Sequence, residues 1–301
     1  MPRACLADEQ GWGAASALAG GLPMKIREAC SLFVDQEARR RNLQQGTING
    51  YKAVFRSLSR WADENGLAAL EELDESKARA WVGSWAYRPS TTRRKLIQLK
   101  AFFRFAVERG WLLRSPVATL RLPKSDSPPT MPLTEAEVLA LLGDCEKQPK
   151  ERALILLMRH SGLAIGDAVT LKRASIVETE LTLRRVKGGE LVTVELPLAV
   201  VTAIRAIRGA NPDYFWWTGR GQPITCERYW RSRLRAIARR AGVEGFRPPR
   251  LRDTFAVAML AEGVPMRELS RLLGHTSVST TERYYAPWDR RPRGTGASGS
   301  G

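Results

Sequence analysis

Histidine is scarce in this sequence, which has 301 residues and only two histidines, His160 and His275. A metal site built from several imidazoles is therefore excluded. Cysteine is also rare, and its four positions lie far apart without any CxxC pair: Cys5, Cys30, Cys145 and Cys226. That spacing argues against a zinc knuckle or a disulfide framework and favours a reducing cytoplasm. We therefore expect no metal and no cofactor.

Acidic residues are few relative to basic ones, with 31 Asp and Glu against 48 Lys and Arg, for a formal net charge of +17. Such an excess favours nucleic acid as the partner, with an anionic membrane surface as the second choice. No apolar run is long enough to span a bilayer, and the first 22 residues lack the pattern of a secretion signal. We expect a cytoplasmic, nucleoid-associated protein that binds double-stranded DNA, with no membrane and no small-molecule substrate.

Proline is concentrated in one segment, 121–132, which reads RLPKSDSPPTMP and contains four prolines. This composition predicts an extended linker between two domains, and the TEAE sequence from Thr134 predicts a capped helix directly after it. We expect a flexible tail at 1–23, a helical domain at 24–118, a linker at 119–132, a second domain at 133–289 and a disordered tail at 290–301.

The first domain is predicted to be all-helical, with one helix from Thr47, as its N-cap, to Asn65 and another from Ser90 to Gly110. The second of these helices has apolar residues on one side and a basic stripe on the other: Arg93, Lys100 and Arg104. The second domain is mixed. Its expected elements are a helix over 150–161, a hairpin of strands 181–185 and 191–196, and helices near 198–208, 223–241, 250–262, 266–273 and 278–286. The fold class is therefore mainly α with a small β-sheet.

Three sequence blocks carry the chemistry: SGLAIGDAVTL at 161–171, LRDTFA at 251–256 and LLGHTSVSTTERYYAPW at 272–288. In this order and spacing they resemble the tyrosine recombinases of the phage-integrase type, over about residues 24–288. The resemblance implies a helical core-binding domain and a mixed α/β catalytic domain. It also implies a site-specific recombinase that cleaves and rejoins DNA through a 3′-phosphotyrosine, working as a homo-tetramer on specific recombination sites.

The resemblance also assigns roles to residues. Tyr284, nine positions after His275, matches the nucleophile, and Tyr285 is the neighbour that could be confused with it. Arg252 matches an arginine that clamps the phosphate, and His275 a histidine that hydrogen-bonds it. In the hairpin, Lys187 matches the general acid for the 5′-hydroxyl. Asp167 matches a supporting acid, although a simple acid at a helix N-terminus is an equal interpretation.

The sequence departs from the family pattern at two positions. Ala164 stands where the first catalytic arginine belongs, and Pro249 stands where a histidine is usual. Because a phosphate-stabilising arginine can contribute about 10³–10⁵ in rate, we expect DNA binding with impaired cleavage. Whether Ala164 is an engineered or a natural residue stays open. So do three other readings: a non-catalytic integrase-derived DNA-binding protein, a topoisomerase-like relaxase and, more distantly, a metal-dependent nuclease.

Arginines predict the DNA-contacting surface. Four fall at helical spacing, at positions 228, 231, 235 and 239, with few acids to pair with them. Arg247 and Arg250 follow and could replace the donor that Pro249 lacks. Together with the basic stripe of the first domain, they predict two domains that close on a duplex, with these contacts: Arg93, Lys100, Arg104, Arg228, Arg231, Arg235, Arg239, Arg247 and Arg250. The sequence specifies neither the DNA target nor the outcome, which could be integration, excision or resolution.

Overall fold

The computed structural model describes residues 23–289 except 41, 125–129, 186–188 and 209–210. The chain divides into two compact units, Met1–Pro128 and Pro129–Gly301. Several sequence-based expectations lie outside the described residues: nearly all of the N-terminal tail, the C-terminal tail from 290, Cys5, part of the linker, and Lys187 in the hairpin.

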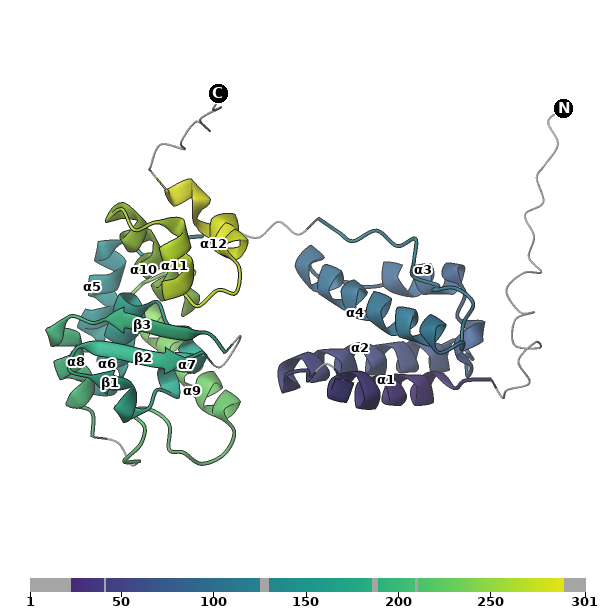
Figure 1. Cartoon of the computed structure of the whole chain (residues 1–301), viewed down its shortest axis with the longest axis horizontal. Coiled ribbons are helices and arrows are strands. Elements are labelled where there is room, and N and C mark those ends of the chain that lie inside the picture. Colours follow the sequence, from purple (N-terminus) through teal and green to yellow (C-terminus); the bar gives the residue numbers. More distant parts are fainter. Residues whose placement is uncertain (1–22, 41, 125–129, 186–188, 209–210, 290–301) are drawn as a thin grey trace, which may run out of the picture. The chain divides into compact units, whose positions relative to one another are not determined.

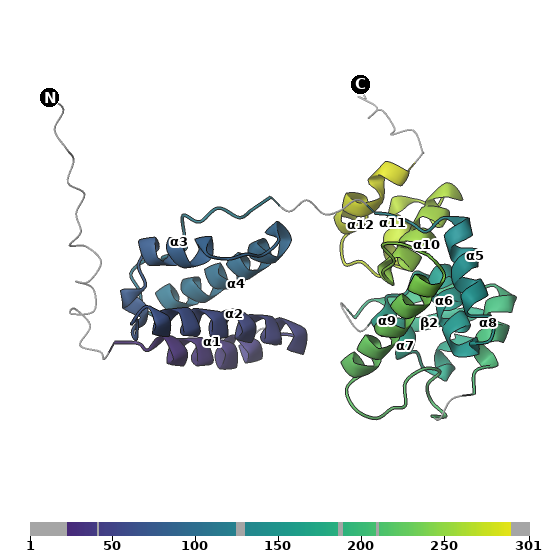
Figure 2. The ribbon, with the colours of Figure 1, turned by 180° about the vertical axis from the view of Figure 1, so that it is seen from behind.

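The first unit is helical (Figures 1 and 2). Its elements are α1 (Ile26–Arg40), α2 (Gln45–Glu64), the short 3₁₀ helix η2 (Leu70–Glu72), α3 (Glu75–Gly83) and α4 (Pro89–Glu108). The core is rich in aromatic rings, because Phe33 of α1 makes edge-to-face contacts with Phe102 and Phe105 of α4 at centroid distances of 5.7 and 5.3 Å. A helix that buries one face in this way leaves its other face to solvent, as expected from the basic stripe on α4.

The predicted N-cap of α2 is wrong. The helix begins at Gln45 with Gln44 as its N-cap residue, and no side chain caps it. The backbone N–H of Thr47 donates to the carbonyl oxygen of Gln44 at 2.9 Å, so Thr47 already lies in the first turn. A threonine near a helix start predicts a cap only to within a turn.

The second unit packs its helices against one face of a small sheet (Figure 1). Its elements are α5 (Glu135–Asp144), α6 (Pro149–Ser161), α7 (Ile165–Val169), η3 (Arg173–Ser175), β1 (Ile176–Val177), β2 (Glu180–Arg184), β3 (Leu191–Glu195), α8 (Leu198–Arg205), α9 (Pro223–Arg240), α10 (Pro249–Ala261), α11 (Met266–Leu272), α12 (Val278–Tyr285) and η4 (Ala286–Trp288). The sheet is antiparallel in the order β1-β2-β3. Helix α6 is the central buried helix of the second unit, with Leu154, Leu157 and Met158 fully buried.

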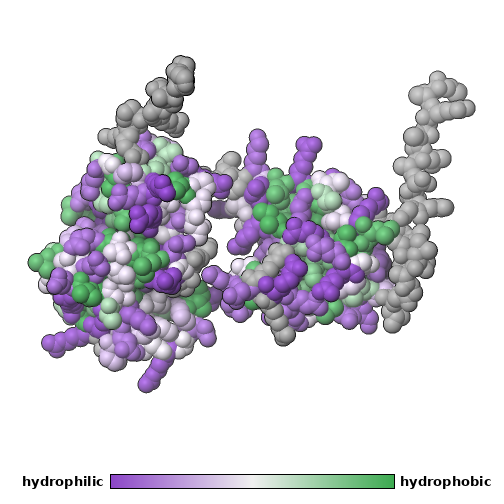
Figure 3. Space-filling view, in the orientation of Figure 1, coloured by the Kyte–Doolittle hydropathy of each residue, from purple (hydrophilic) through white to green (hydrophobic). Residues whose placement is uncertain are grey.

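The expected fold class, mainly α with a small β-sheet, is confirmed. The TEAE capping box is also confirmed, because Thr134 N donates to Glu137 Oε2 at 2.8 Å and Glu137 N donates to Thr134 Oγ1 at 3.2 Å. On the face drawn in Figure 3, polar side chains cover much of each unit and apolar ones lie in separate patches. Among the helices described, none combines the length and apolarity that crossing a membrane requires.

Candidate active site

Arg252 is the centre of the candidate site. It lies in the first turn of α10, and its Nη1 donates to the carbonyl oxygen of Gly162 at 2.7 Å, at the end of α6. Its Nη2 donates to the carbonyl oxygen of Leu273 at 2.7 Å and lies 2.9 Å from His275 Nε2. Burial, and then the charge of Arg185, lower the pKa of the guanidinium to about 10. Arg252, at the start of α10, therefore connects this helix to the ends of α6 and α11.

His275 owes its position to the turn that ends α11. Gly274 adopts φ +61°, and His275 N then donates to the carbonyl oxygen of Ser270 at 2.9 Å. Since Arg252 can only donate, Nε2 of His275 accepts, and Nδ1 carries the proton toward Thr281 Oγ1 at 2.8 Å. Burial first, then the charges of Arg252 and Arg185, lower the pKa of His275 to about 4. The imidazole is therefore neutral at pH 7.

Asp167 lies in the first turn of α7 and forms a buried ion pair with Arg185, at 2.8 Å between Oδ2 and Nη1. Arg185 follows β2 directly, and its Nη2 also donates to the carbonyl oxygen of Leu273. The two arginines, 185 and 252, thus converge on one carbonyl. No role was predicted for Arg185 from the sequence. Alternation along the strand puts it on the same face as the buried Leu181, but its charge concealed that it is buried.

The two neighbouring tyrosines at the end of α12 have opposite environments. Tyr285 is 3% exposed, and its hydroxyl donates to Asp253 Oδ1 at 2.9 Å. Burial raises the pKa of the Tyr285 phenol and of the Asp253 carboxyl. Tyr284 is 38% exposed, and within the described residues its hydroxyl has no hydrogen-bond partner. Its backbone oxygen accepts from Thr130 Oγ1 at 2.7 Å, which fixes the chain but leaves the ring at the surface.

The two departures from the family pattern both lie at helix starts. Ala164 is exposed as the N-cap residue of α7, and Pro249 is exposed as the first residue of α10. Neither side chain has a hydrogen-bond donor. Lys187 lies outside the described residues, but its hairpin is in register, with Arg184 opposite Leu191 and Arg185 N donating to the carbonyl oxygen of Glu190 at 2.8 Å.

Arg250 does not lie on the surface where DNA could meet it. It is 8% exposed, and its Nη2 contacts both carboxylate oxygens of Glu137 at 3.0 Å. Its Nε and Nη1 donate to the carbonyl oxygens of Met131 and Glu244, each at 3.0 Å. The side chain ties α10 to the chain entering α5, and this placement removes Arg250 from the candidates for DNA contact. A buried arginine needs such partners, and sequence spacing does not reveal them.

Some of the other residues predicted to contact DNA are exposed, and others already bond to neighbouring groups of the chain. Arg228, Arg235 and Arg239 of α9 are exposed, whereas Arg231 pairs with Glu227 on the same helix. Arg247 is also exposed. On the first unit, Arg93 and Lys100 donate to the carbonyl oxygens of Pro123 and Ala118 at 3.2 and 2.9 Å, and Arg104 lies 3.8 Å from Glu108. The basic face of α4 is therefore partly occupied by the backbone of the segment that follows the helix.

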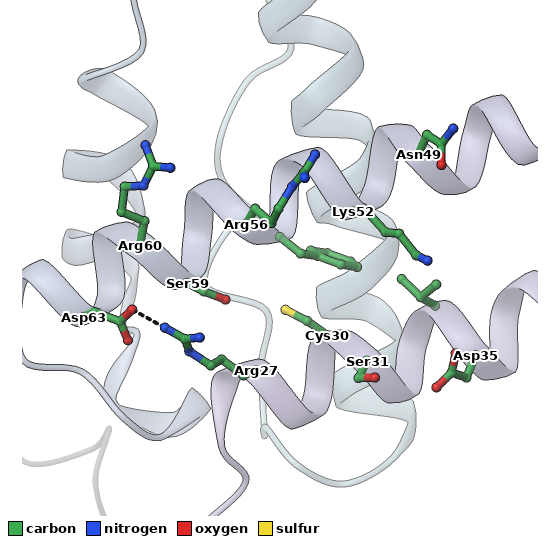
Figure 4. Close-up of a pocket in the computed structure, with 12 residues that line it drawn as sticks. Arg27, Cys30, Ser31, Asp35, Asn49, Lys52, Arg56, Ser59, Arg60 and Asp63 are labelled. Atoms are coloured by element: carbon green, nitrogen blue, oxygen red, sulfur yellow. Dashed lines mark hydrogen bonds and ion pairs between the residues drawn. The ribbon is translucent and has the colours of Figure 1, made fainter. Parts of the chain in front are cut away.

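A second basic stripe, which the sequence reasoning missed, lies on α2. Lys52, Arg56 and Arg60 are exposed at intervals of four residues (Figure 4). They border a groove along α1 and α2 in which Arg27 pairs with Asp63 at 2.5 Å. Their spacing is a signal that could have identified the stripe, because residues four apart share one face of a helix.

Comparison with known proteins places these features in a family. The family model described as "Phage integrase family" matches residues 132–291, and "Phage integrase, N-terminal SAM-like domain" matches residues 32–110. Among curated proteins, the tyrosine recombinase XerC of Rhodospirillum centenum is 29% identical over 263 residues, which cover 79% of this chain and 76% of that protein. The tyrosine recombinase XerD of Haemophilus influenzae is 25% identical over 279 residues, covering 87% and 94%.

Solved structures share the fold. A lambda integrase (75–356) dimer bound to a COC′ core site superposes with a TM-score of 0.68 at 21% identity, covering 85% of this chain and 97% of that one. A lambda integrase tetramer bound to a Holliday junction gives a TM-score of 0.69 at 19% identity, covering 91% and 84%. At these identities the likeness concerns the arrangement of the elements.

Proposed function

The chain belongs to the phage integrase family, and from that premise we propose that it is a site-specific DNA recombinase that cleaves and rejoins strands through a 3′-phosphotyrosine at Tyr284. The observation that carries this proposal is the convergence of Arg252 and His275 beside the helix of Tyr284. A guanidinium at that point can hold a scissile phosphate through two N–H donors.

The two tyrosines differ in a way that supports Tyr284 as the nucleophile. Its ring is exposed and its hydroxyl is not engaged within the described residues, so a DNA phosphate can reach it. The hydroxyl of Tyr285 is buried and donates to Asp253, and its raised pKa opposes loss of the proton. Tyr285 fixes the end of α12 against α10, and Tyr284 is the residue available to attack.

The remaining roles follow from the chemistry of phosphoryl transfer. Arg252 neutralises the charge that grows on the phosphate oxygens. His275 would contact the phosphate once it moves from Arg252, and Lys187 would protonate the leaving 5′-oxygen. Because the phosphotyrosine conserves the energy of the phosphodiester, the reaction requires no cofactor. The proposed working unit is a homo-tetramer on two DNA sites, and its tetrameric state is supported by the lambda integrase tetramer bound to a Holliday junction.

Ala164 impairs this reaction. The methyl group at the start of α7 provides neither charge nor donors where the family has an arginine. Pro249 removes a second donor and leaves only a favourable helix start. We expect the chain to bind DNA and to cleave it slowly.

Covalent capture tests the proposal. The chain, Ala164→Arg, and Ala164→Arg with Tyr284→Phe are each mixed in EDTA with nicked duplexes that tile the DNA flanking the coding sequence. An SDS-resistant protein–DNA adduct with Ala164→Arg alone supports a recombinase. If none of the three proteins forms an adduct although each binds the duplexes in a gel shift, the proposal fails.

A non-catalytic DNA-binding protein of integrase origin is the second candidate. It is favoured by the two positions without donors, Ala164 and Pro249, both exposed at helix starts beside the site. In such a protein Ala164→Arg would restore nothing, whereas a recombinase with one missing arginine would regain cleavage. The same capture experiment therefore separates the two.

A further inference from the structure

Two guanidinium groups meet at the candidate site although position 164 provides none. Arg252 and Arg185 both donate to the carbonyl oxygen of Leu273, one from α10 and the other from the end of β2. The Arg185 side chain also pairs with Asp167, which lies three residues beyond Ala164 in the first turn of α7. The guanidinium of Arg185 is therefore linked, through Asp167, to the helix that begins directly after Ala164.

The charges at this point leave one guanidinium without a carboxylate partner. Within the described residues Arg252 forms no ion pair, because its partners are two carbonyl oxygens and His275. Arg185 has the carboxylate of Asp167. The other nearby acid, Asp253, accepts from the hydroxyl of Tyr285. The positive charges of Arg185 and Arg252 repel each other, and a bound anion would offset this repulsion. A phosphodiester, which carries one negative charge, is such an anion.

Arg185 also retains unused donors. A guanidinium has five N–H groups, and within the described residues two are engaged, one on Nη1 and one on Nη2. Its Nε is buried without a hydrogen-bond partner. Most buried donors in folded proteins have a partner, and the contacts that hold α7 against the turn after α11 supply none to this Nε.

We propose that Arg185 provides the second guanidinium of the phosphate site, from the end of β2 in place of an arginine at position 164. This inference rests on the proposed function. Asp167 fixes the orientation of Arg185, and Leu273 sets its spacing from Arg252. Its side chain is 3% exposed, so a phosphate that binds it must displace a neighbouring group, and the exposed Ala164 adds no side chain that would compete for that phosphate. An arginine at 164 would supply the same charge and make Arg185 dispensable.

The test is a double-mutant cycle between positions 164 and 185. Arg185→Gln is made in the unaltered chain and in Ala164→Arg, and Arg185→Lys, which retains the charge, is made in the unaltered chain. Arg184→Gln is the matched control, because Arg184 is the preceding residue, is exposed and, among the described residues, donates only to the carbonyl oxygen of Gly189. Melting temperatures show which variants fold.

Two readouts are measured on each protein. The first is the rate of adduct formation with the tiled nicked duplexes. The second is binding of inorganic phosphate, followed by NMR through the imidazole signals of His275. In the unaltered chain, Arg185→Gln should weaken both by at least about tenfold, Arg185→Lys should weaken them less, and Arg184→Gln should change neither. In the Ala164→Arg background, Arg185→Gln should weaken phosphate binding and adduct formation by less than about threefold.

The outcomes separate the inference from the function on which it rests. Equal losses on both backgrounds would mean that Arg185 only supports the fold, and no loss on either would mean that it does not serve the site; each overturns the inference. If phosphate binding depends on Arg185 as stated but no protein forms an adduct, the anion site stands and the recombinase proposal fails.

Discussion

His275 is held as a neutral imidazole by residues that the sequence places far apart. Its Nε2 accepts from Arg252 and its Nδ1 donates to Thr281, so both ring nitrogens are defined before any substrate binds. In this state Nε2 has no proton to give to a phosphate. We infer that phosphate binding must either displace His275 from Arg252 or recruit a proton to it.

We predict that the free protein keeps His275 neutral, with the proton on Nδ1, down to about pH 4, the value to which burial and the two arginines lower its pKa. The unfolded chain takes up this proton near pH 6.5, so between these values it binds more protons than the folded chain. The neutral His275 therefore contributes fully to the free energy of unfolding above pH 6.5, and this contribution is lost as the pH falls from 6.5 to about 4. NMR of ¹⁵N-histidine-labelled protein, with His160→Gln to simplify the spectrum, measures this directly. Titration of His275 near pH 6.5 would contradict the geometry.

The tyrosine pair gives a second prediction at this scale. In the Ala164→Arg background, Tyr284→Phe should abolish the covalent adduct, whereas Tyr285→Phe should retain it. Tyr285→Phe should instead reduce the free energy of unfolding by about 1–2 kcal/mol, because the buried Asp253 loses a hydrogen-bond donor. Adduct formation and urea unfolding are measured on both variants, and the opposite pattern in the adduct would assign the nucleophile to Tyr285.

At the scale of elements, the turn after α11 sets the site. Gly274 has φ +61°, and a Cβ there would lie 2.7 Å from Arg185 Nε and 2.9 Å from Val192 Cγ2. Only glycine allows the backbone before His275 to lie this close to β3 and to Arg185. The turn therefore determines the positions of His275 and of both arginines together.

We expect Gly274→Ala to lower the free energy of unfolding by about 2–4 kcal/mol, through a left-handed backbone and a steric clash. Gly263→Ala is the matched control, because Gly263 also has a positive φ of +85° but a Cβ there meets nothing within 4 Å. Gly263→Ala should lower the free energy of unfolding by about 1 kcal/mol, because only the left-handed backbone conformation opposes the alanine. Urea unfolding of the two variants checks the difference, and equal losses would show that the turn is not tightly packed against Arg185.

Local signals in the sequence predicted elements well and contacts less well. The capping box at Thr134 was readable because its partners lie within one turn of helix. The cap at Thr47 was wrong because any polar residue near a helix start fits that pattern. The burial of Arg250 and the pairing of Arg185 with Asp167 could not be predicted, since their partners lie 113 and 18 residues away. For Arg185, alternation from Leu181 indicates the buried face but not the partner.

At the scale of the whole molecule, the excess of positive charge should determine how strongly DNA binding depends on salt. Arg228 and Arg235 of α9 are exposed and have no acid within salt-bridge distance among the described residues. Each phosphate that they neutralise contributes about −0.9 to the slope of log K against log salt. Replacing both with Gln should reduce that slope by about 2. Lys147→Gln with Lys150→Gln, which removes the same charge from another exposed segment, should change it by less than about 0.5. Equal changes in the two pairs would show that only net charge matters.

We propose that this chain has the strand-cleaving machinery of its family, weakened at one position. The most direct measurement is the yield of SDS-resistant adduct for the unaltered chain, Ala164→Arg, and Ala164→Arg with Tyr284→Phe on the same nicked duplexes in EDTA. We predict a low yield for the first, an increase of at least about 10²-fold for the second and none for the third. An equal yield with and without Tyr284, or no adduct from any protein that binds the DNA, would contradict strand cleavage by this chain.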